Sequence, residues 1–101
     1  MLELEPKLVG ETKNYSVDFA DVLATSETIS TKTVTATTYS GTDASPSSIV
    51  SGSATSSGSI VSQNITAGTL GVVYQLLYQI TTSSSRTLQK AAWLTVVSPL
   101  P

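Results

Sequence analysis

Apolar and polar residues alternate along most of the chain, and this pattern predicts β-strands rather than helices. A spacing of two residues recurs, whereas no long window sustains the spacing of 3.6 residues that an amphipathic helix requires. A short, clean example covers residues 15–19, and the strongest covers residues 72–82. The latter strand is expected to carry four apolar side chains on one buried face: Tyr74, Leu76, Tyr78 and Ile80.

Three further strands are expected. Residues 28–39 form a Thr-rich strand, in which the uneven spacing of apolar residues predicts a bulge or a change of face. Residues 58–66 form a shorter strand, and residues 86–97 form the last one. In the last strand Trp93 falls on the face opposite to the main apolar face. The last two strands are expected to pair as a hairpin through residues 83–86.

The middle and the beginning of the chain show weaker patterns. Ile49 and Val50 predict a short strand. Residues 51–57 are polar and of low complexity, so they are predicted to be a mobile surface loop. Residues 1–13, interrupted by a proline and a glycine, are interpreted as an irregular N-terminal arm.

About seven strands in a chain of 101 residues predict an all-β fold, an Ig-like antiparallel β-sandwich formed by residues 14–101. The chain contains no cysteine, so this core must hold without a disulfide. Two roles stay open for Tyr74, which begins a late core strand three residues after a glycine. It is either a corner residue whose hydroxyl reaches back to nearby backbone or an ordinary core tyrosine.

Hydroxyl side chains take the place of charges in this sequence. Ser and Thr supply 33 of the 101 residues, charged residues make up 12%, and the net charge is −2. Because basic residues are so few, we expect no nucleic-acid partner. Low net charge favours association, so the surface is either a tolerant polar β surface or one that partner chains partly cover. The strand at 28–39 has only Lys32 as a charged guard, which makes it a candidate docking edge.

The sequence offers little catalytic chemistry. With no His and no Cys, it lacks His–Cys zinc sites, thiol nucleophiles and Ser-His-Asp triads. Asp18 and Asp21 could in principle hold a hard cation with Glu27, but a strand-end aspartate followed by a turn aspartate favours hydrogen bonds to turn amides. We therefore expect no enzyme activity, no metal, no cofactor and no small-molecule substrate.

No basic and apolar leader opens the sequence, which predicts synthesis in a cytoplasm without a signal peptide. The longest apolar stretch, residues 71–80, is interrupted by two glutamines and is far shorter than a membrane span. We therefore expect no membrane partner.

Apolar residues outside the expected core are candidates for contacts with other chains. Leu2, Leu4, Leu8 and Val9 precede the first clear strand, so the isolated arm would be poorly ordered. In an assembly the same arm would lie on a neighbour or add an edge strand to it. Trp93 is a further candidate, because its outward position favours a sheet-covering or inter-subunit contact over a sugar-stacking platform.

Five segments carry motifs in a characteristic order. They are residues 6–7, 15–24, 27–30, 64–74 and 81–87. A Pro-Lys pair is followed by Tyr-x-x-Asp-Phe, by Glu-Thr-Ile, by a Gly-containing turn before a Tyr, and by a Thr-Thr-Ser hairpin that ends in Arg-Thr. In this order the motifs resemble small virion structural proteins of tailed bacteriophages, of the fiber–tail adaptor type. Three turns depart from that pattern: Ser26 and Ser85 stand in place of Gly, and Thr66-Ala67 in place of Ser-Gly.

The resemblance implies a virion protein at the neck or tail that attaches tail fibers or stabilises the head-to-tail assembly, with no catalytic residues. Its partners would be portal, neck, tail or fiber proteins, and it would form a symmetric homo-oligomer in the particle. Two alternatives are a capsid-decoration Ig-like protein and a carbohydrate-binding adhesion module that uses Trp93 and residues 51–57.

Overall fold

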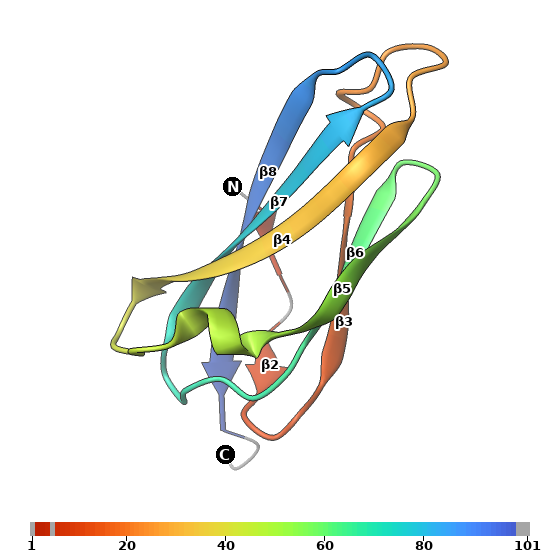
Figure 1. The fold of residues 1–101 in the computed structure, drawn as a ribbon. Helices are drawn as coiled ribbons and strands as arrows, with labels where there is room; N and C mark the ends of the chain where they lie inside the picture. The colour runs from red at the N-terminus through yellow and green to blue at the C-terminus, as the bar shows by residue number, and fades with distance from the viewer. Residues whose placement is uncertain (1, 5, 99–101) are drawn as a thin grey trace.

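The structure, a computed structural model, describes residues 2–4 and 6–98 as two β-sheets that lie face to face (Figure 1). In chain order the elements are β1 (Leu2–Glu3), β2 (Lys7–Leu8), β3 (Lys13–Asp18), β4 (Ile29–Ser40), the short 3-10 helix η1 (Pro46–Ile49), β5 (Val50–Ser57), β6 (Ile60–Ile65), β7 (Val73–Thr82) and β8 (Thr87–Val97). One sheet has the order β4, β7, β8, with β1 and β2 both on the outer edge of β8. The other has the order β3, β6, β5. The predicted cysteine-free β-sandwich is confirmed.

The core consists of the inward faces that the alternating pattern predicts. All four apolar residues assigned to one face of β7 are fully buried, and the inward residues of β3, β6 and β8 pack against them. The Tyr78 hydroxyl donates a hydrogen bond of 2.9 Å to the carbonyl oxygen of Tyr15 and so links the two sheets through the middle of the core. A buried hydroxyl without such a partner would destabilise the fold, so this bond fixes how the sheets stack.

The prediction of a mobile loop at residues 51–57 is wrong, because these residues form most of β5. The strand pairs with β6 in an antiparallel register, for example Ser51 with Asn64 and Thr55 with Ser62. Between these pairs the register shifts, so that residues 52–54 bulge opposite Gln63 alone. Serine and glycine give little strand signal, and the segment has one apolar side chain, so its alternation is invisible in the sequence.

The N-terminal segment lies along its own sheet. Leu2 and Glu3 pair in parallel with Ala92 and Trp93, and β2 pairs in parallel further along β8. The amides of Leu4 and Val9 extend this pairing, with hydrogen bonds of 2.8 and 3.0 Å to β8 carbonyls. The segment is irregular only in being broken into two-residue strands. The division of the chain at residues 13 and 14 stays a prediction.

Three non-glycine residues adopt left-handed backbone conformations, and they stand at the three turns where the phage resemblance leads us to expect glycine. Their φ angles are 67° at Ser26, 53° at Ala67 and 63° at Ser85. Glycine adopts this region without the steric cost that a Cβ atom adds. All three turns therefore have a backbone conformation that suits glycine, although each has a side chain at this position.

Candidate interaction surface

The outer face of the larger sheet is uncharged along β7 and β8. The strand register places its side chains in rows, such as Gln75 beside Trp93 and Leu77 beside Ala91. On β7 and β8 the outward positions are half-buried or exposed, and none of them is charged: Val73, Gln75, Leu77, Gln79, Thr81, Thr87, Gln89, Ala91, Trp93, Thr95 and Val97. Threonine hydroxyls and glutamine amides both donate and accept hydrogen bonds, so such a face suits a flat, neutral protein neighbour.

Trp93 lies on this outer face, as its position in the alternation predicts. Its ring stands 4.9 Å from the ring of Tyr39, centroid to centroid, at an interplanar angle of 36°. The buried Nε1 atom of the indole has no hydrogen-bond partner among the described residues. Residues 51–57 belong to the opposite sheet, so the structure does not bring them together with Trp93 into one sugar-binding site.

The structure separates the apolar residues of the N-terminal segment into two groups. Leu4 and Val9 pack against the core of their own chain. Leu8 is half-buried and pairs with Val97 at the margin of the outer face. The side chain of Leu2 lies outside the described part of the structure. Of these residues, Leu8 is therefore the one that the fold places beside the neutral face.

Lys7, which sequence reasoning did not single out, anchors the N-terminal segment to the rest of the molecule. Its side chain is fully buried, and Nζ donates hydrogen bonds of 2.8 Å to the Leu8 carbonyl and 2.6 Å to the Ala67 carbonyl. Burial lowers the pKa of Lys7, and the nearby charge of Glu11 opposes that shift. The available sequence signal was the Pro-Lys pair of the phage resemblance.

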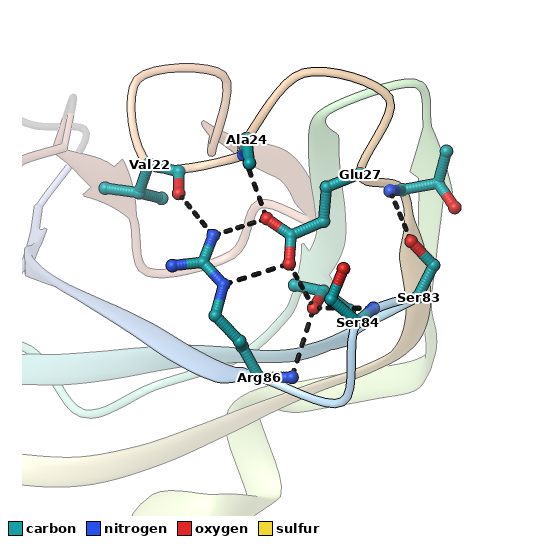
Figure 2. A network of polar contacts seen from close by, with 8 residues as sticks. Val22, Ala24, Glu27, Ser83, Ser84 and Arg86 are labelled. Carbon is teal, nitrogen blue, oxygen red and sulfur yellow. Dashed lines mark hydrogen bonds and ion pairs between the residues drawn. The ribbon is translucent and has the colours of Figure 1, made fainter.

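An ion pair between buried Glu27 and half-exposed Arg86 holds the loop between β3 and β4 against the hairpin between β7 and β8 (Figure 2). The Glu27 side chain is 1% exposed and receives hydrogen bonds from the Arg86 guanidinium, at 2.9 Å from Nε to Oε2, from the Ala24 amide at 2.9 Å and from the Thr82 hydroxyl at 2.5 Å. These donors, Arg86 foremost, hold the pKa of Glu27 well below its usual range. Arg86 also donates to the Val22 carbonyl at 3.1 Å, so one guanidinium ties two loops together.

The three acidic residues considered for a cation are used in other ways. Asp18 accepts hydrogen bonds from the Ser59 hydroxyl at 2.7 Å and from the Ala20 amide at 2.8 Å, which lower its pKa. Asp21 forms an ion pair of 2.5 Å with Lys90, while Glu27 faces Arg86. Within the described residues, no group of three or more His, Cys, Asp or Glu side chains gathers as a metal site would require.

Tyr74 adopts the corner role, the first of the two roles left open for it. Its hydroxyl receives a hydrogen bond of 2.8 Å from the Thr69 amide, five residues upstream. It also donates one of 2.5 Å to Asp43, in the loop after β4. Beside it, Gly68 has a φ of 98° and leaves no room for a side chain, since an added Cβ would lie 2.9 Å from Val96 Cγ2. Tyrosine and glycine together fix the turn before β7.

None of the helices in the described residues has the length and apolarity that a membrane crossing requires. No curated protein matches the chain, and no solved structure matches it either. One protein family does match, over residues 7–95, and its description is "Podophage GP4 fiber-tail adaptor protein gp77". That match spans most of the chain, including every strand from β3 to β7 and nearly all of β8. The chain therefore belongs to the podophage fiber-tail adaptor family.

Proposed function

We propose that this phage structural protein is a non-enzymatic, Ig-like module that joins tail fibers to the tail through protein–protein contacts. The observation that carries the proposal is the family match over residues 7–95. The strand order supports the Ig-like description: β3, β6, β5 corresponds to B, E, D, and β4, β7, β8 corresponds to C, F, G of the immunoglobulin sandwich.

The contacts would use the neutral outer face of the larger sheet. Trp93 and Leu8 lie on or beside it and are the strongest of the proposed contact residues. Leu4 and Val9 would support it from beneath, and Leu2 is the remaining member of the set. Several copies would surround the tail axis as a symmetric homo-oligomer, because tail structures are built around a symmetry axis and low net charge permits close approach.

Electron microscopy of virions tests this function. Particles from a phage that lacks this chain are expected to keep heads and tails but to lose most of their fibers, and the wild-type chain supplied in trans should restore them. A label fused to the chain should mark the tail at the points where fibers attach. A label spread evenly over the head would contradict the proposal and favour capsid decoration.

A further inference from the structure

In the described chain, the larger sheet ends at β4, the smaller sheet has β5 as one of its two edges, and β4 and β5 border the same groove. The two strands approach each other along one side of the sandwich (Figure 1). Between them lies an open groove of about 470 Å³. Unpaired backbone groups at such an edge can receive an additional strand.

The groove is built to receive backbone and small apolar side chains. Its apolar lining comes from Val34 on one side and from Val50 and Ala54 on the other. At its base lies the side chain of Gln63. Its Nε2 atom donates hydrogen bonds of 2.8 and 3.3 Å to the carbonyls of Ser51 and Gly52 on β5, and one of 3.0 Å to the carbonyl of Asn64 on its own strand. Gln63 thereby holds the β5 bulge in place, and this leaves residues 52–54 without a partner on β6.

Lys32 supplies the charge of the groove. Its position in the register, opposite buried Ile80, turns its side chain inward, where it is half-buried. Among the described residues the Lys32 ammonium has no hydrogen bond or ion pair, whereas Lys7, Arg86 and Lys90 all have defined acceptors. An inward lysine on an edge strand discourages pairing with neutral strands. The same charge favours a strand that brings a carboxylate.

We propose that β4 is completed in the virion by an extended strand of a neighbouring tail or fiber protein, and that this strand places an aspartate or glutamate against Lys32. This inference rests on the proposed adaptor function. A second copy that pairs through its own β4 or β5 does not fit, because neither strand contains an acidic residue. The other edge of the smaller sheet, β3, has Asp18 at its end, but this carboxylate already accepts hydrogen bonds from Ala20 and Ser59 of its own chain. The occupant is therefore a partner strand with small apolar residues on one face and one carboxylate among them.

Peptide binding to the full-length protein tests the inference. The probes are capped ten-residue peptides of alternating valine and threonine, with one aspartate moved stepwise along the peptide and an asparagine version of each. Binding is followed by NMR of the backbone amides. At least one aspartate peptide should shift amides of β4 and β5, and its asparagine version should bind about tenfold more weakly, the effect of losing one charge-assisted hydrogen bond.

Two variants sharpen the result. Lys32→Gln should weaken binding of the aspartate peptide about tenfold and make the two peptide versions equivalent. Lys13→Gln, on β3 and away from the groove, should bind as the wild type does. Thermal melts confirm that both variants fold. The inference is overturned if no peptide shifts the β4 amides, or if aspartate and asparagine peptides bind Lys32→Gln and wild type alike. Neither result touches the adaptor function, which the fiber count on virions tests separately.

Discussion

The two edges of the larger sheet are finished in opposite ways. At the β8 edge, the N-terminal segment adds β1 and β2 and buries Leu4 and Val9 against the core. At the β4 edge, no strand of the described chain is hydrogen-bonded to the outer side of β4, and residues 30–34 of this strand line the open groove. The β8 edge is therefore covered by the chain's own N-terminal segment, while the β4 edge is the one that we propose a partner strand completes.

The two edges also differ in how their lysine side chains are bonded. Lys7 and Lys32 both point inward from a strand. Lys7 is fully buried and donates to two carbonyl oxygens, whereas Lys32 is half-buried and has no partner among the described residues. A lysine is a compact charge that needs acceptors when it loses water. We infer that Lys7 holds the N-terminal segment on β8, and that Lys32 selects which strand binds beside β4.

Removal of residues 1–9 should uncover the β8 edge of the larger sheet. This truncation should lower the free energy of unfolding by about 3 kcal/mol, because it exposes core surface beneath Leu4 and Val9 and removes the strand pairing. Urea denaturation measures the change. Leu8→Thr, which alters only the outward side of β2, is the matched control and should cost far less. Equal stability of the truncated and complete chains would show that the segment does not close the edge.

The substitution Gly68→Ala should strain the turn between β6 and β7. The new Cβ would meet Val96 Cγ2 at 2.9 Å, and alanine disfavours a φ of 98°. We expect a loss of about 2 kcal/mol, within the usual range for enforced backbone strain. Gly10→Ala, at an exposed position with open space around it, serves as control. Equal urea midpoints for the two variants would show that the turn does not require glycine at position 68.

Acid should weaken the ion pair between Glu27 and Arg86, which lies just before β4. Because hydrogen bonds from Arg86, Ala24 and Thr82 lower the pKa of Glu27 in the folded state, its stabilising effect is complete above the ordinary carboxyl pKa of about 4.3. The effect is lost progressively as pH falls below that value. Glu27→Gln should therefore be less stable than wild type at pH 7, and the difference should shrink at pH 2.5. Urea midpoints at the two pH values decide this, and a difference that grows in acid would contradict it.

The smallest expected effect is a gain in stability at the loop that Lys7 holds. Ala67→Gly should raise the free energy of unfolding by about 0.5 kcal/mol, because glycine relieves the left-handed strain at a φ of 53° but adds entropy to the unfolded chain. The Lys7 contact is to the Ala67 carbonyl, so the substitution keeps it. A clear loss of stability would show that the methyl group, rather than the backbone, matters there.

Sequence reasoning predicted the long strands well, because each carries enough apolar residues on one face to show its period. It missed β5, where serine and glycine hide the alternation. It also missed the pairing of β1 and β2 with β8, since two-residue strands have no period and their partner lies at the other end of the chain. Long-range polar contacts such as Glu27 with Arg86 leave no local signal in a single sequence.

The motifs of the phage resemblance, however, contain most of these hidden contacts. Lys7 lies in the Pro-Lys pair, Glu27 in the Glu-Thr-Ile segment, Arg86 in the hairpin and Tyr74 at the end of the Gly-containing turn. In the structure each of these side chains makes a buried or part-buried hydrogen bond to a segment distant in sequence or to a turn. These four motif residues therefore stabilise the fold.

The most direct test of the central claim is a cryo-electron microscopy reconstruction of the virion tail at side-chain resolution. We predict that a strand from a neighbouring tail or fiber protein pairs with β4, with a carboxylate side chain beside Lys32, while β1 and β2 of the same chain remain on β8. A β4 edge that faces solvent, or that meets its neighbours only through other surfaces, would contradict the account.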